Sequence, residues 1–316
     1  MVKLRRSHKT GSNAGDWLSF IEGFEFETDE HLLATLLGFI EYRCNTKMNL
    51  KLDARQKVEA DELKQNDLNA WRHMQPLWVN SPGFTQDIID NFEQKLKLDS
   101  QQKSLSEPQL LAYIESYCYL YFDFYLEVIT HYEVGCRFYF NEDQEKKKTD
   151  LGIITKAILS YAADDEVKTC FGGMLKELKD VGTELVGKTS YRKLASFIEI
   201  EEDKSIACDE SLADKQYGQL KDWRNGKSLP NNAKLITFLQ SFDEYIDSDS
   251  GFITFVMCRI TMGVDKLVNE FLVQSKRENC NQADVEVIIK NVLAAMPEYY
   301  KANLKKQLDK KSQLHE

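Results

Sequence analysis

Apolar residues recur at intervals of three and four through nearly every segment of the chain, the spacing that places them on one face of an α-helix. The most regular pattern runs from Gln109 to about Phe140. Only 15 of the 316 residues are Gly and 5 are Pro, so the chain has few of the residues that form tight turns and many that favour helices. The sequence therefore predicts an all-α protein with the aromatic helix 109–140 at its core.

The chain is long enough for two packed helical parts, because hydrophobic cores seldom grow beyond about 250–300 residues without splitting. A run of charged residues at 141–150 interrupts the helical pattern and is the expected boundary; the solvated end of a long helix is an equally good interpretation. We expect a disordered basic arm over 1–15, an N-terminal helical domain over 16–140 and a C-terminal helical domain over 150–316. Short connections between the predicted helices indicate a multi-helix bundle.

Charge and cysteine content limit the environment and the partners of the protein. The formal net charge of −10 at pH 7 disfavours a polyanion-binding surface over the whole molecule, so that nucleic acid would need a local basic patch. Seven scattered cysteines without a CxxC pair are typical of reduced thiols inside the cell. The sequence contains neither a secretory signal nor the roughly 18 apolar residues of a membrane span. We expect a cytoplasmic protein with no membrane partner.

Three polar residues share one face of the predicted central helix. Asp123, Glu127 and His131 follow one another at i, i+4 and i+8, which brings carboxylate and imidazole groups within reach of one ion. They are weak candidates for metal ligands. The simpler interpretation is that they form the only face that this helix exposes to water. We expect no bound metal and no cofactor, because no second helix supplies the Glu-x-x-His pattern of a di-iron bundle.

Sequence motifs of the common enzyme classes are missing. The chain contains no GxSxG, GxxxxGK[ST], GxGxxG or HExxH pattern. It has five His residues, and these provide few general bases with a pKa near neutrality. These observations favour a protein without catalytic activity, although pairs of catalytic carboxylates leave no pattern in a sequence.

The segment 190–240 has the order of parts of a helix-turn-helix. The stretch SYRKLASFIEI predicts a first short helix with Ser190 as its N-cap, DKQYGQLKDWRNGK predicts a second helix that ends at Gly226, and a further helix follows. The residues expected to be buried are Leu194, Ala195, Ile198, Leu220, Trp223, Leu235 and Phe238. Such a buried side leaves the opposite side of the second helix free for the major groove of DNA.

These residues resemble the lambda-repressor-like, Xre-type helix-turn-helix family. In that family Ser-x-x-x-Leu-Ala precedes the turn, and Trp-x-x-Gly-Lys-x-x-Pro follows the recognition helix. The matching residues here are Ser190, Leu194, Ala195, Trp223, Gly226, Lys227 and Pro230, within a resemblance that covers roughly 55 of the 316 residues. The chain departs from the family in carrying Glu199 where a turn Gly is usual, and in about fifteen additional residues before the second helix.

The resemblance implies a DNA-binding surface on the second helix. It places Gln216, Tyr217, Gly218, Gln219 and Asp222 toward the groove, and Asn225 and Lys227 near phosphate. The candidate nucleic-acid-binding residues are Lys215, Gln216, Tyr217, Gln219, Lys221, Arg224, Asn225 and Lys227. We expect their basic members to be exposed and Trp223 to be buried. From Lys188 to Glu244, nine Lys or Arg stand against ten Asp or Glu, so the segment is near neutral.

Three functions stay open on the sequence, in this order. The first is a DNA-associated regulatory protein with a divergent Xre-like helix-turn-helix. The second is a helical scaffold without catalytic activity that binds a protein partner or forms a homo-oligomer; in that case the Gly and Pro after Trp223 only end a helix. The third is a metal-dependent enzyme centred on the aromatic helix. A basic face around Arg224 would favour the DNA-associated regulator. An exposed apolar groove would favour the scaffold, and a convergent pocket of carboxylates and imidazole would favour the enzyme.

Overall fold

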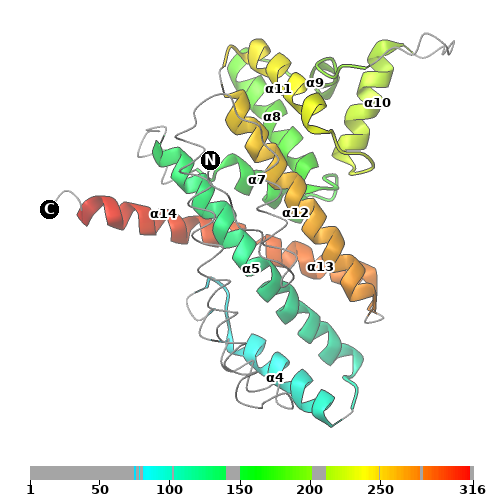
Figure 1. The fold of residues 1–316 in the computed structure, drawn as a ribbon, viewed down its shortest axis with the longest axis vertical. Helices are drawn as coiled ribbons and strands as arrows, with labels where there is room; N and C mark the ends of the chain where they lie inside the picture. The colour runs from blue at the N-terminus through cyan, green and yellow to red at the C-terminus, as the bar shows by residue number, and fades with distance from the viewer. Residues whose placement is uncertain are drawn as a thin grey trace, which may run out of the picture. The chain divides into compact units, whose positions relative to one another are not determined.

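The computed structural model describes residues 75, 78, 81–101, 103–139, 150–200, 211–248, 250–277 and 280–313. The expected arm over 1–15, residues 141–149 of the charge run and residues 201–210 of the helix-turn-helix-like segment lie outside this part of the chain. Every regular element within it is a helix (Figure 1), so the all-α prediction is confirmed. Among these helices, none combines the length and the apolar character that a membrane crossing requires.

Two compact units make up the chain. The first combines Met1–Gln144 with Glu270–Glu316, and the second is Glu145–Asn269. One boundary between them falls inside the charge run, where a division is expected. The other boundary is not expected from the sequence, which assigns all of 150–316 to one domain. It lies within α12 (Gly251–Arg277), a helix that contributes to both units.

The first unit is built around the long helix α5 (Glu107–Tyr139), as the aromatic pattern predicts. Three helices pack on α5, namely α4 (Gln86–Ser100), α13 (Gln282–Leu293) and α14 (Met296–Gln313). In Figure 1, α4 runs beside the N-terminal half of α5. Residues 128–134 of α5 are all buried. They span nearly two helical turns, so other segments shield this part of α5 from water on all its sides. The C-terminal helices therefore belong with α5 and not with the helices that precede them in the chain.

The second unit contains α7 (Ile153–Ala163), α8 (Cys170–Val186), α9 (Tyr191–Ala195), α10 (Leu212–Arg224), α11 (Asn232–Ile246) and the first part of α12. Helix α8 contacts α7, α10 and α11. Each of the helices α8 to α11 begins after a Thr, Ser or Asn whose side chain accepts a hydrogen bond from the amide three residues further on. These local caps satisfy amides that the first turn of a helix leaves without a partner.

A buried carboxylate joins α12 to the first turn of α8. Asp265 accepts hydrogen bonds from the Cys170 amide at 2.6 Å and from the Phe171 amide at 2.9 Å. Thr169 Oγ1 accepts the next one, from the Gly172 amide at 2.8 Å. The amides at a helix start favour an ionised carboxylate, but burial has the larger effect and raises the pKa of Asp265 to about 7. This group therefore titrates near neutral pH in the native state.

Replacing Asp265 with Asn should remove a pH dependence from the stability of the second unit. The pKa of Asp265 is about 7 in the native state, against 3.8 for an unperturbed Asp, so the native state keeps a proton that the unfolded state releases between these values. Its stabilising contribution is complete below about pH 4 and is lost as the pH rises toward 7.

We expect the stability advantage of the wild type over Asp265→Asn to shrink by a few kcal/mol between about pH 4.5 and about pH 7.5. Native-state hydrogen exchange of α8 amides measures this difference for the second unit alone. An advantage that is the same at both pH values would contradict the assignment.

Candidate functional site

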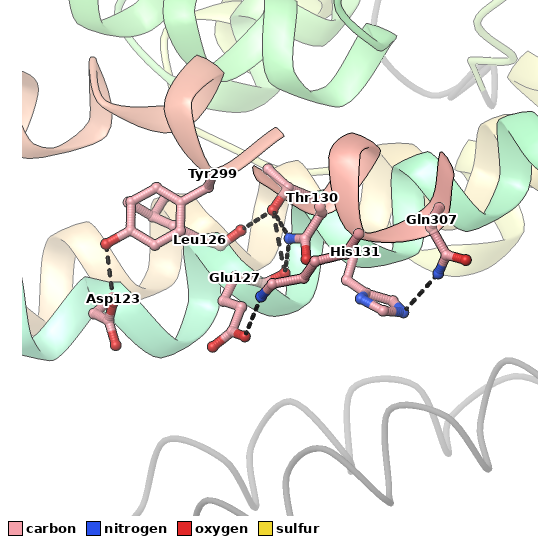
Figure 2. A network of polar contacts seen from close by, with 9 residues as sticks. Asp123, Leu126, Glu127, Thr130, His131, Tyr299 and Gln307 are labelled. Atoms are coloured by element: carbon pink, nitrogen blue, oxygen red, sulfur yellow. Dashed lines mark hydrogen bonds and ion pairs between the residues drawn. The ribbon is translucent and has the colours of Figure 1, made fainter. Parts of the chain in front are cut away.

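The three candidate metal ligands of α5 lie along its contact with α14 and face different partners (Figure 2). Asp123 accepts a hydrogen bond from the Tyr299 hydroxyl at 2.9 Å. Glu127 Oε1 lies 3.7 Å from the ammonium nitrogen of Lys306, and His131 Nε2 lies 3.5 Å from the side-chain amide nitrogen of Gln307. Within the described residues, no group of three or more His, Cys, Asp and Glu side chains is placed to hold a metal ion.

The interpretation of this stripe as a water-exposed face of α5 is wrong for two of its three residues. The exposed fraction is 0% for Asp123 and 7% for His131. The stripe is buried because α14 carries a polar row with the same spacing, Tyr299, Asn303 and Gln307. Polar groups removed from water need hydrogen-bond partners, and α14 supplies several of them, although Asn303 Oδ1 has no partner among the described residues. The shared i, i+4, i+8 spacing is a sequence pattern from which this pairing could have been found.

The middle of this polar contact is formed by Asn303. Its side-chain nitrogen donates to the Glu127 carbonyl at 3.2 Å and to Thr130 Oγ1 at 2.9 Å, and the Thr130 hydroxyl donates to the Leu126 carbonyl at 2.7 Å. Burial raises the pKa of the Tyr299 phenol, which stays protonated and able to donate to the carboxylate. The arrangement fixes the register of α14 on α5, a structural role.

The helix-turn-helix-like segment has the buried residues that its sequence predicts. The expected set, Leu194, Ala195, Ile198, Leu220, Trp223, Leu235 and Phe238, is buried throughout. Trp223 is 1% exposed, and its ring packs edge-on against Phe238 with 5.7 Å between centroids. Ser190 caps α9 as predicted, with its hydroxyl accepting from the Lys193 amide at 3.2 Å. Helix α10 packs on α9, and the ring contact between Trp223 and Phe238 joins α10 to α11.

Helix α10 ends in a left-handed glycine that lies close to the start of α8. Gly226 has φ +67°, its amide donates to the Trp223 carbonyl, and the Lys227 amide donates to the Asp222 carbonyl at 3.0 Å, the two bonds of a Schellman motif. The Thr169 hydroxyl donates to the Arg224 carbonyl at 3.2 Å. The stretch LKDWRNGKSLP is therefore a capped helix end that is held by the second unit.

The predicted exposure of the basic residues holds for only half of them. Lys221 and Lys227 are exposed, whereas Lys215 and Arg224 are half-buried. The Arg224 guanidinium lies 3.7 Å from the ring centroid of Tyr191, a distance that allows a cation–π interaction. Arg224 thus contacts the first residue of α9, and part of its charge is directed at a ring of the protein itself.

Other residues expected to face a groove also take part in the contact between α9 and α10. The Gln216 amide donates to the Ile198 carbonyl at 2.8 Å. The Arg192 guanidinium lies 4.9 Å from the Tyr217 ring centroid and 3.4 Å from Asp214 Oδ1. The sequence interpretation did not include Arg192. Its position in the first short helix, near the aromatic and acidic residues of the second helix, is the signal that could have identified it.

Three exposed residues spaced by four and three, Asp214, Gly218 and Lys221, define the outer side of α10, opposite Leu220 and Trp223. Of the charged residues counted from Lys188 to Glu244, five acids and one Lys lie in 201–210. The described residues of this segment therefore carry eight basic side chains against five acidic ones. Their local charge is positive, although the segment as a whole is near neutral.

Comparison of the chain with protein-family models, with curated proteins and with solved structures gives no significant match. The case for a function therefore depends on the geometry and the charge of the described residues. The contact between α5 and α14 forms a structural polar network, and α9 with α10 provides a supported helix with an open outer side.

Truncation of Trp223 should destabilise the second unit. Trp223→Ala removes a fully buried ring from the contact with Phe238, and we expect a loss of about 3–5 kcal/mol. Trp223→Phe is the matched control and should lose less, because it keeps an aromatic ring in the same place. Hydrogen exchange of α10 and α11 amides measures both losses. A cost below about 1 kcal/mol for Trp223→Ala would show that the site collapses without the ring.

Removal of the Tyr299 hydroxyl should weaken the contact between α14 and α5. Tyr299→Phe leaves the buried Asp123 carboxylate without one of its donors, and we expect a cost of about 1.5–3 kcal/mol, the usual range for hydrogen bonds to charged groups. A double-mutant cycle with Asp123→Asn, followed by hydrogen exchange of α14 amides, should give a coupling of at least about 0.5 kcal/mol. Purely additive losses would indicate that the two groups act independently.

Proposed function

We propose that the protein is a DNA-associated regulatory protein whose second unit binds double-stranded DNA through the outer side of α10. The packing of α10 is the observation that supports this proposal most directly. Leu220 and Trp223 hold one side of the helix in the core, while Lys221 is exposed. A helix supported in this way suits the major groove of B-DNA, which is wide enough to admit one α-helix.

The charge of the helices gives independent support. In the described residues from Lys188 to Glu244, basic side chains outnumber acidic ones by eight to five. Lys215 and Lys221 form no ion pair within the described part of the chain. Lysines without a nearby carboxylate are available to phosphate, and each phosphate that they neutralise releases counterions from DNA. A local basic surface of this kind is compatible with the acidic net charge of the whole protein.

The two other candidate functions have weaker support. The candidate metal ligands are engaged with α14, so a metal-dependent reaction has no site among the described residues. A scaffold would use exposed apolar residues, and those of the second unit are Leu185, Val186, Leu212, Leu229 and Ile236. Exposed apolar residues are common on protein surfaces. They therefore support a scaffold less strongly than the lysines of α10 support DNA binding.

Binding of the intact protein to a random-sequence DNA duplex should be detectable at low salt and should depend on α10. We expect Lys215→Ala with Lys221→Ala to weaken binding and to reduce the slope of log K against log[salt] by about two units, roughly one for each phosphate contact. Fluorescence anisotropy at about 50 and 200 mM salt measures both effects.

The matched control is Lys301→Ala with Lys305→Ala, which makes the same charge change at exposed positions of α14. This variant should bind DNA like the wild type. A wild-type protein that binds no duplex at low salt would contradict the proposed function, and equal effects of the two double variants would show that α10 is not the binding surface.

A further inference from the structure

Recognition of a base sequence in the major groove requires side chains that present hydrogen-bonding groups to base edges. Arg and Lys pair with guanine, Asn and Gln pair with adenine, and each good bidentate pair contributes about 1–3 kcal/mol of discrimination. Apart from three lysines and the C-cap residue Asn225, α9 and α10 contain two Arg and two Gln, namely Arg192, Arg224, Gln216 and Gln219. Whether these groups are available decides how much sequence information the helix can use.

Three of these four side chains have partners within the second unit. The Gln216 amide donates to the Ile198 carbonyl. The Arg224 guanidinium lies over the Tyr191 ring. Arg192 lies 4.9 Å from the Tyr217 ring centroid and 3.4 Å from Asp214 Oδ1, with its side chain 67% exposed. Base recognition by Gln216 and Arg224 would first require loss of their contacts with Ile198 and Tyr191.

The centre of the outer side carries no side chain. Gly218 is exposed in the middle of α10, and a Cβ atom added there would meet nothing within 4 Å. A helix-interior Gly costs about 1 kcal/mol relative to Ala, and no internal packing requires it here. An external partner that approaches the backbone of α10 accounts for a position without a side chain.

The flanking residues also favour contact with phosphate over contact with bases. Asp214 could accept a hydrogen bond only from a cytosine amino group. Lys221 carries a compact charge on a flexible stem, which serves a phosphate as well as a base. Gln219 is half-buried and makes no side-chain hydrogen bond with the described residues. It is the one amide of this helix that is left for direct recognition of a base pair.

We infer that this module takes duplex DNA as a class and not one operator sequence: it binds through the phosphate backbone, and base contacts by Gln219 and Lys221 specify at most two base pairs per copy. This inference rests on the proposed function. Two such contacts contribute about 2–6 kcal/mol, which limits the preference for the best sequence to about 10⁴-fold, whereas specific regulators reach about 10⁷-fold.

The test is a selection by the intact protein from a random duplex library at low salt, followed by affinity measurements on the most enriched duplex and on unselected DNA. We expect a ratio below about 10⁴ and no more than two specified base pairs per copy. Gln219→Ala should remove the preference at one base pair and leave the affinity for unselected DNA within a few-fold. Lys221→Ala should weaken binding to both duplexes.

Other outcomes separate this inference from the proposed function. Three or more specified base pairs per copy, or a preference above about 10⁴-fold, would overturn the inference while leaving DNA binding intact. No binding to any duplex would overturn both.

A second pair of variants tests the close approach of DNA to the backbone of α10. Gly218→Ala should stabilise α10 and weaken binding to all duplexes, whereas Gly135→Ala, which also meets nothing within 4 Å, should leave binding unchanged; equal binding by both variants would place the DNA away from Gly218.

Discussion

The second unit depends on the contact between the start of α8 and the end of α10. The Thr169 hydroxyl accepts a hydrogen bond from the Gly172 amide and donates one to the Arg224 carbonyl. A Cβ atom on Gly172 would lie 2.5 Å from that carbonyl oxygen, so only glycine allows this approach. Asp265 brings α12 to the same helix start. The direction of α10, and thus what its outer side can reach, follows from this junction.

The side chains that attach α9 to α10 are those that a DNA-reading helix would need for bases. Gln216 and Arg224 stabilise the module by engaging the Ile198 carbonyl, just after α9, and the Tyr191 ring of α9. The same engagement leaves few hydrogen-bonding side chains on the outer side of α10. In the proposed complex with DNA, such a helix would hold phosphate by charge and discriminate little among sequences. The proposed regulatory function therefore needs its selectivity from elsewhere, such as a partner or a local concentration of sites.

The first unit uses polar residues for a different purpose. Two rows with the same spacing, led by Asp123 on α5 and Tyr299 on α14, meet at a largely buried contact in which the Tyr299 hydroxyl donates to Asp123 and the Asn303 amide to Thr130. A one-turn shift of α14 would separate Asn303 from Thr130 and leave both buried groups with poorer partners. A buried polar network can define the register of two helices in this way more sharply than apolar contacts do.

The sequence by itself determined the helical class, the central helix, the caps at Ser190 and Gly226, and the burial of Trp223, because periodicity and capping depend on residues within a few positions of each other. The tertiary structure decided the roles of the polar residues. Asp123 and its donor Tyr299 are 176 positions apart, so the pattern on α5 alone could not distinguish a metal ligand, a solvated face and a buried contact. The environment of Gln216 likewise depended on the path of α9, since a side chain acquires its partner only when distant segments pack together.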